Sequence, residues 1–151
     1  MTAPNFSSIL DESPTEIARP QPAPVGSYLC TIIGQPRMGE SAKKKTPFVE
    51  FDLKPIQALD DVDPEELSAY LDRIGDLGSK SFKYTIYTTE ANVYRLDELH
   101  VAAGCDMTDG ATRKQRNDMI INSQVVIYYK HRPSERGDMM FGEISSVSSA
   151  E

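Results

Sequence analysis

The sequence predicts a mainly β domain with interleaved helices. Two observations lead to this prediction: several segments alternate apolar and polar residues with a period of two, and segments with helix-capping signals lie between them. The chain has 151 residues, of which 39% are hydrophobic, and this is enough for one domain with a single core. We therefore expect one folded unit over residues 25–149, preceded by a tail.

The expected tail covers residues 1–24. Five of the ten prolines lie in it, and the segment 19–24 favours an extended, polyproline-like conformation. Phe6, Ile9 and Leu10 form a small apolar cluster within the tail. Two interpretations are open: a disordered leader, or a peptide that docks on a neighbour or on the domain itself.

Five segments have the patterns of strands. In the second segment, Val49, Phe51 and Leu53 point to one face while charged residues point to the other, and the third segment alternates in the same way. The fourth segment is apolar on both faces, as a central or barrel strand would be. The expected strands are residues 26–33, 47–56, 80–88, 123–130 and 139–147.

Helical signals lie between these strands. Asp63 precedes a proline and two acidic residues, which predicts an N-cap and the first turn of a helix over residues 63–74. A second helix is expected to begin near Thr89, to carry apolar residues on one face and to end at Gly104. A short third helix is expected over residues 112–121.

The order of these elements predicts a particular architecture. Five antiparallel-type strands with the main helix between strands 3 and 4 follow the order of the OB-fold, a five-stranded Greek-key barrel. A long, helix-containing connection also fits a mixed sheet. The expected fold is therefore an OB-fold-like barrel, in which ligands bind across strands 2 and 3 between two flanking loops.

The charges of the chain are distributed unevenly. The formal net charge is -7, which argues against a protein that coats nucleic acid through overall positive charge. However, the expected loops at residues 34–46 and 130–137 carry +3 and +2, so the rest of the chain carries -12. Two basic loops beside an OB-fold groove, together with aromatic side chains, suit a single nucleic-acid strand, because cations contact phosphates while rings stack on bases.

The residues predicted to bind nucleic acid are cations and aromatic rings. Phe48, Tyr87 and Tyr128 are the aromatic candidates, while Lys54, Lys83 and Arg95 are weaker cationic ones. Glu50 and Asp52 share the same expected face and count against the prediction, because they would repel phosphate. The predicted site comprises Arg37, Lys43, Lys44, Lys45, Phe48, Lys54, Lys83, Tyr87, Tyr128, Lys130, Arg132 and Arg136.

No motif predicts catalysis, a metal or a cofactor. Cys30, His100, Cys105 and His131 form neither a Cys-x-x-Cys pair nor a His pair at helical spacing. The acidic run 59–66 lacks the ligand spacing of a calcium loop and is better explained as a capped helix start. The chain contains no nucleophile elbow, phosphate loop or dinucleotide-binding motif.

A set of segments supports a family resemblance: residues 24–28, 44–51, 85–90, 94–96 and 126–144. These segments resemble a family of small phage-encoded proteins that was long described only as a domain of unknown function. That family is similar to phage single-stranded DNA-binding proteins with OB-folds. The resemblance implies DNA contacts by Lys43, Lys44, Lys45, Phe48, Tyr87, Lys130 and Arg132. The C-terminal residues 145–151 differ from those of bacterial single-stranded DNA-binding proteins, because they lack an acidic tip with an apolar ending.

We therefore expect a non-enzymatic protein that binds single-stranded DNA during phage replication or recombination, with replication or recombination proteins as partners. Two cysteines and no secretory signal favour the cytoplasm, that of the host if the protein is phage-encoded, and no apolar run predicts a membrane partner. The main alternative is an interaction or virion-structural protein that forms a homo-oligomer through the barrel and tail. A small nuclease using Asp60, Asp61 and Asp63 is the third possibility.

Overall fold

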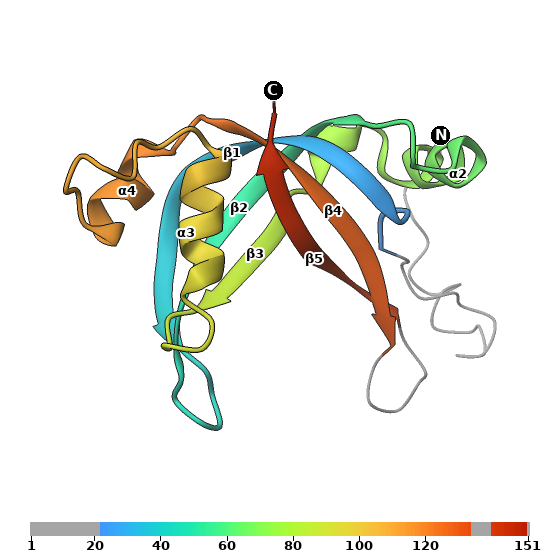
Figure 1. Ribbon diagram of the computed structural model, residues 1–151. Helices are drawn as coiled ribbons and strands as arrows, with labels where there is room; N and C mark the ends of the chain where they lie inside the picture. The colour runs from blue at the N-terminus through green and yellow to red at the C-terminus, as the bar shows by residue number, and fades with distance from the viewer. Residues whose placement is uncertain (1–21, 134–139, 151) are drawn as a thin grey trace.

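The computed structural model describes residues 22–133 and 140–150 (Figure 1). The expected tail up to residue 21, with its apolar cluster, and Arg136 in the second basic loop lie outside the described residues. The strands are β1 (Gly26–Glu40), β2 (Pro47–Ala58), β3 (Phe82–Tyr87), β4 (Gln124–Pro133) and β5 (Met140–Ser149). The helices are α2 (Pro64–Ile74), α3 (Tyr94–Ala102), α4 (Arg113–Met119) and the short 3-10 helix η2 (Leu77–Ser79).

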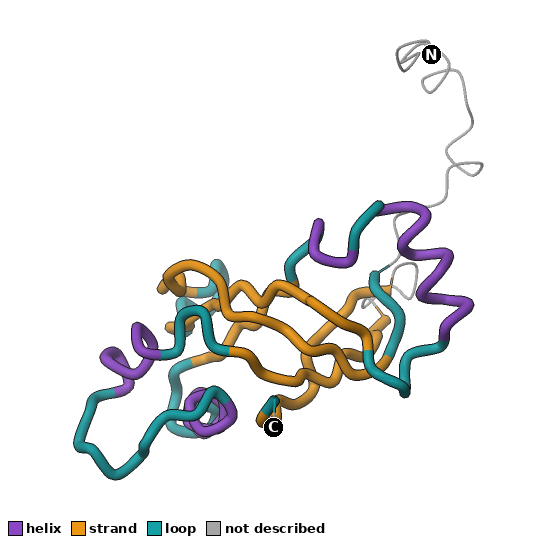
Figure 2. The backbone as a smooth tube through the Cα atoms, turned by 90° about the horizontal axis from the view of Figure 1, so that it is seen from above, coloured by secondary structure: helices purple, strands orange, loops and turns teal. Residues whose placement is uncertain are grey.

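The five strands form one antiparallel sheet in the order β3-β2-β1-β4-β5. The sheet is open, with β3 and β5 as its two edges, and it does not close on itself. Side-chain contacts, rather than a hydrogen-bonded ladder, connect the two edges: the ring of Tyr129 lies against Gly142 of β5 and stacks on Phe82 of β3 at 4.4 Å. Helix α2 lies at the opposite end of the sheet from α3 and α4 (Figures 1 and 2).

The first strand is longer than predicted. We expected it to end before Gly34, but it continues to Glu40 and pairs with β2 along its length. A register shift between Ile33 and Arg37 allows this continuation, and Gly34 lies within it at a φ of 66°. A glycine adopts this left-handed conformation without the steric cost of a Cβ, so the strand bends there and resumes pairing.

The helix predicted from the Asp63 cap is confirmed, whereas the helix expected from Thr89 begins later in the chain. Asp63 caps α2 by accepting hydrogen bonds from the amides of Glu65 and Glu66. Thr112 caps α4 in a capping box with Gln115. The helix expected from Thr89 begins instead at Tyr94, after a turn.

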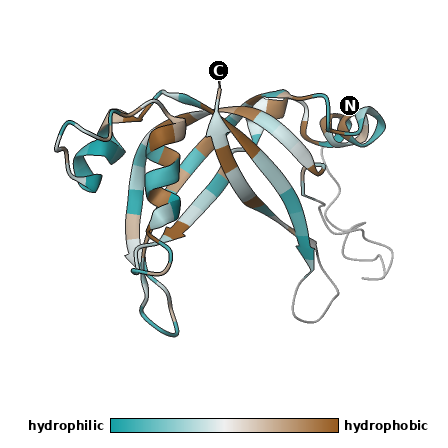
Figure 3. Cartoon of the chain, viewed as in Figure 1, coloured by the Kyte–Doolittle hydropathy of each residue, from teal (hydrophilic) through white to brown (hydrophobic). Residues whose placement is uncertain are grey.

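Hydrophobic and hydrophilic residues alternate along the strands, as the colours of Figure 3 show. This alternation decides which side chains are buried. Val49, Phe51 and Leu53 of β2 are at most 2% exposed, as predicted. On β3, Phe82, Tyr84 and Ile86 are buried, and Cys30 of β1 is buried as well. As predicted, β4 is a central strand, between β1 and β5, but only one of its faces is buried: Val125, Ile127 and Tyr129 are buried, whereas Val126 is half-buried and Tyr128 is 39% exposed.

A buried histidine joins α3 to α4. Nε2 of His100 lies 2.7 Å from Oδ1 of Asn117, while its Nδ1 has no hydrogen-bond partner among the described residues. Burial lowers the pKa of His100 below its ordinary value, and the cations Arg113 and Arg116 lower it further, whereas Asn117 and Asp97 oppose the shift. The folded protein therefore holds this imidazole neutral near pH 7.

This burial predicts that acid destabilises the protein. In the unfolded chain His100 takes up a proton near the ordinary histidine pKa of about 6.5, whereas in the folded chain protonation requires a lower pH. The free energy of unfolding should therefore fall as the pH drops below about 6.5. Urea unfolding midpoints measured between about pH 7 and about pH 5 should decrease in the wild type. The slope should be lost in His100→Gln and kept in His131→Gln; equal slopes in all three proteins would contradict the prediction.

Candidate nucleic-acid interface

Two aromatic rings lie next to each other on the outer face of β2 and β3. Phe48 and Tyr87 are direct cross-strand partners, with ring centroids 6.3 Å apart and planes at 80°. Tyr87 is 42% exposed and Phe48 is half-buried. The ring of Phe48 lies against Gly39 of β1, where a side chain would collide with it. The pair therefore offers a fixed aromatic platform to solvent.

Three lysines lie in the connection beside this platform. Lys43, Lys44 and Lys45 are exposed between β1 and β2. Hydrogen bonds between Ser41 and Thr46 close the connection, including one of 2.9 Å from the amide of Thr46 to the Ser41 hydroxyl. Because β2 begins at Pro47, directly after Thr46, the three lysines are near Phe48 in the sequence.

The acidic residues of this face are paired with cations. Arg37 was predicted to lie in a loop, but it lies on β1. Its guanidinium donates hydrogen bonds to Asp52 at 2.8 and 3.0 Å and to Glu50 at 2.6 Å. Lys83 of β3 contacts Asp52 at 2.8 Å, and Thr85 donates to Glu50 at 2.6 Å. Hydrogen bonds from Arg37 and Lys83 hold the pKa of Asp52 well below its usual range, and those from Thr85 and Arg37 lower the pKa of Glu50.

These pairs change the electrostatics of the face in two ways. The expected repulsion of phosphate by Glu50 and Asp52 is reduced, because both carboxylates have cationic partners. At the same time Arg37 and Lys83 are engaged, so a phosphate would have to share them with carboxylates. The lysine connection at 43–45 remains the more accessible source of positive charge.

A groove of about 440 Å³ separates the edge strands β3 and β5. Tyr87 lines it on the side of β3, and Arg95 of α3 lines it as well. From β4 and β5 come Arg132 and Glu143, whose Nε and Oε2 are 3.3 Å apart. The other oxygen of Glu143 lies 3.5 Å from Nζ of Lys130. Cationic, acidic and aromatic groups thus meet in one groove next to the aromatic platform.

The other predicted residues are placed in different surroundings. Lys130 and Arg132 lie on β4, because this strand continues to Pro133 instead of ending in a loop. Tyr128 lies on β4 and pairs with Ser27 of β1. Because β1 separates β4 from β2 in the sheet, Tyr128 is not part of the platform. Lys54 is exposed on β2 beside η2.

The sequence reasoning missed several groove residues, among them Glu143 and Asn92. The alternation along the last strand could have placed Glu143 opposite in phase to the buried Ile144. Asn92 precedes α3 in a turn, and no periodic pattern marks it. Its amide group donates to the Thr89 hydroxyl at 3.2 Å and lines the groove.

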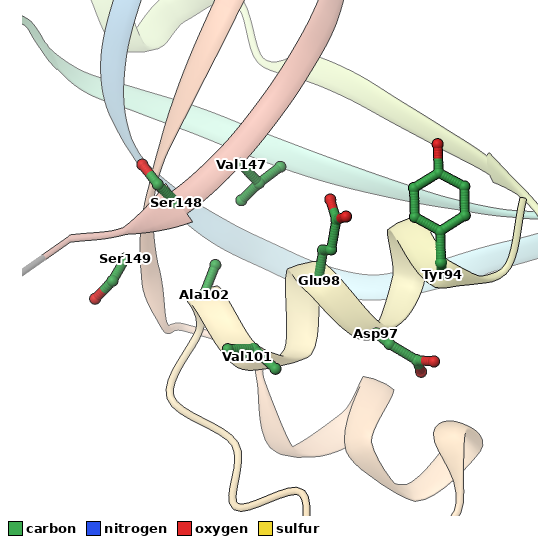
Figure 4. Close-up of a pocket in the computed structure, with 8 residues that line it drawn as sticks. All are labelled: Tyr94, Asp97, Glu98, Val101, Ala102, Val147, Ser148 and Ser149. Carbon is green, nitrogen blue, oxygen red and sulfur yellow. The ribbon is translucent and has the colours of Figure 1, made fainter.

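A second groove, of about 410 Å³, lies between α3 and the end of β5 (Figure 4). It is mostly apolar, and two of its apolar side chains, Tyr94 and Val101, are 50% and 58% exposed. Val147 lines it from β5, while Asp97 and Glu98 add negative charge. The lining of this groove suits contact with another apolar surface better than contact with phosphate.

Comparisons with known proteins assign the chain to no family. No protein-family model matches it, and no curated protein matches it. Among the residues that the structure describes, no three His, Cys, Asp or Glu side chains gather as metal ligands. None of the described helices is long and apolar enough to cross a membrane.

Proposed function

We propose that this protein binds single-stranded DNA without catalysing a reaction, in phage replication or recombination. The observation that carries the proposal is the Phe48–Tyr87 platform, which is exposed on the sheet beside three lysines. Aromatic rings stack on unpaired bases of any sequence, and nearby cations contact the phosphates. The phage setting comes from the sequence resemblance alone.

The strand order supports an OB-fold-like arrangement. A sheet ordered β3-β2-β1-β4-β5, with a helix between β3 and β4, has the connectivity of this partly open Greek-key barrel. In such folds the face of strands 2 and 3 binds oligonucleotides, flanked by the loops between strands 1 and 2 and between strands 4 and 5. The platform lies on that face, and Lys43, Lys44 and Lys45 lie in the first of these loops.

The charge distribution favours a single strand over a duplex. The chain carries -7 overall, and the acids of the face are partly neutralised by Arg37 and Lys83. A duplex presents a broad, stiff surface of phosphates, which an acidic body would repel outside the basic segments. A flexible single strand can follow the confined basic region and expose its bases to the rings.

A salt titration tests the proposal and the lysine connection together. Fluorescence polarisation with labelled oligothymidine of about 12 nucleotides should show binding that weakens as salt rises from about 50 mM to about 200 mM. Replacing Lys43, Lys44 and Lys45 by glutamine should reduce the log–log salt slope by up to about 2, since each lost phosphate contact contributes about 0.7.

The control is Lys114→Gln on α4, an exposed lysine away from the platform, which should keep the wild-type slope. A matched duplex should bind more weakly than the single strand. Failure of the wild type to bind single strands at low salt would refute the function, and an unchanged slope in the triple variant would remove these lysines from the site.

The second candidate function is that of an interaction or virion-structural protein. The apolar groove between α3 and β5 favours it, because Tyr94 and Val101 expose apolar surface there. Light scattering separates the two functions. A defined oligomer that is lost on removing residues 1–24, combined with no DNA binding, would favour assembly over DNA binding.

A further inference from the structure

We propose that the groove between β3 and β5 binds a guanine base of the single strand and gives the protein a preference for guanine. This inference rests on the proposed function and adds base selectivity to it. The groove has a volume of about 440 Å³, which lies within the range of about 300–1,000 Å³ found for small-molecule sites. It adjoins the aromatic platform through Tyr87, which lines the groove and also pairs with Phe48.

The groove offers an aromatic surface for the flat face of a base. Tyr84 and Ile144 also line it, but each is only 6% exposed. Tyr87 contributes an exposed aromatic side. An unstacked base of a single strand gains by stacking on an aromatic ring while its edges stay available for hydrogen bonds.

Two charged groups in the groove are suited to the edges of guanine. Arg132 presents a guanidinium, which binds the adjacent acceptors O6 and N7 of guanine in the commonest base-specific contact. Glu143 presents a carboxylate, which accepts hydrogen bonds and suits the donors N1–H and N2–H2 on the other edge of guanine. Adenine offers only one acceptor and one donor to the arginine, and thymine offers no amino group.

The contact between Arg132 and Glu143 is loose enough to open. Its length is 3.3 Å, and that of Lys130 to Glu143 is 3.5 Å, whereas strong charge-assisted hydrogen bonds measure about 2.7–2.9 Å. Arg37 and Asp52, by comparison, lie 2.8 Å apart. The side chains of Arg132 and Glu143 are 61% and 37% exposed, so they can turn toward a base without leaving a buried charge unpaired.

Oligothymidines of about 12 nucleotides with one central substitution test this preference. A central guanine should bind about 10-fold tighter than a central adenine, and inosine, which lacks the N2 amino group, should lie between them. In Glu143→Gln the guanine preference should fall to about 2-fold or less, because one carboxylate acceptor becomes a donor. Unsubstituted oligothymidine should bind this variant at least as tightly as the wild type, since a negative charge has been removed.

The matched control is Asp72→Asn on α2, which also removes one exposed negative charge but does not line the groove. It should keep the full guanine preference. Equal affinities for the three central bases in the wild type would overturn the guanine site and leave single-strand binding intact. A guanine preference unchanged in Glu143→Gln would also overturn it, whereas failure of every oligonucleotide to bind would overturn the proposed function itself.

Discussion

Replacing Phe48 and Tyr87 together by alanine is expected to weaken binding to single-stranded DNA by roughly 100-fold. Each ring that stacks on a base contributes about 1–3 kcal/mol, and the two rings form one platform on neighbouring strands. Fluorescence polarisation with oligothymidine measures the loss. The salt slope should change little, because the phosphate contacts of the lysine connection remain.

Two further variants separate stacking from folding. Tyr87→Phe keeps the ring and should bind like the wild type, whereas Tyr87→Ala alone should lose about 10-fold. Tyr128→Ala removes a ring of similar exposure, 39% against 42%, from a strand outside the platform, and its affinity should be unchanged. Comparable losses in Tyr128→Ala and Tyr87→Ala would show that the platform is not the binding surface.

The second large effect concerns the contact that replaces strand pairing between β3 and β5. Gly142→Val should destabilise the protein by about 3 kcal/mol, because any side chain at this position collides with the ring of Tyr129. That ring is buried and stacks on Phe82 at 4.4 Å, so moving it away would disrupt this stacking contact. The free energy of unfolding in urea measures the effect.

A double-mutant cycle identifies the cause of this loss. In a Tyr129→Ala background, Gly142→Val should cost much less than in the wild type, because the colliding ring is gone. Ser146→Val introduces the same side chain at an exposed position of β5 and should change stability by less than about 0.5 kcal/mol. Additive effects of the two substitutions would rule out the ring contact as the reason for this glycine.

The local signals of the sequence predicted the elements well where one physical cause dominated. Alternation along 47–56 identified the buried face of β2, because successive side chains of a strand point to opposite sides. Asp63 marked the start of α2, because its side chain satisfies amides that a helix leaves free. The long first strand was missed, because Gly34 is typical both of a strand end and of a bulge, and only pairing with β2 distinguishes them.

The candidate site was only partly predictable. Phe48 and Tyr87 could be recognised as outward-facing residues of their strands, but their pairing depends on the register between segments about 40 residues apart. The positive charge of the basic loops was also only partly predictable, because the sum of +5 was counted along the chain without regard to the residues on neighbouring strands. Arg37 and Arg132 proved to be paired with carboxylates of neighbouring strands, so the loop sum overstated the free positive charge.

By itself, then, the sequence determined that five strands form, which faces of β2 and β3 are buried and where α2 begins, because these depend on backbone geometry within a few residues. The tertiary structure alone decided that the sheet stays open, with Tyr129 packed against Gly142 between the edges. It alone placed Glu143 beside Arg132 in a groove. Such contacts join residues from different strands, and strand register sets which charges neutralise each other and which rings remain exposed.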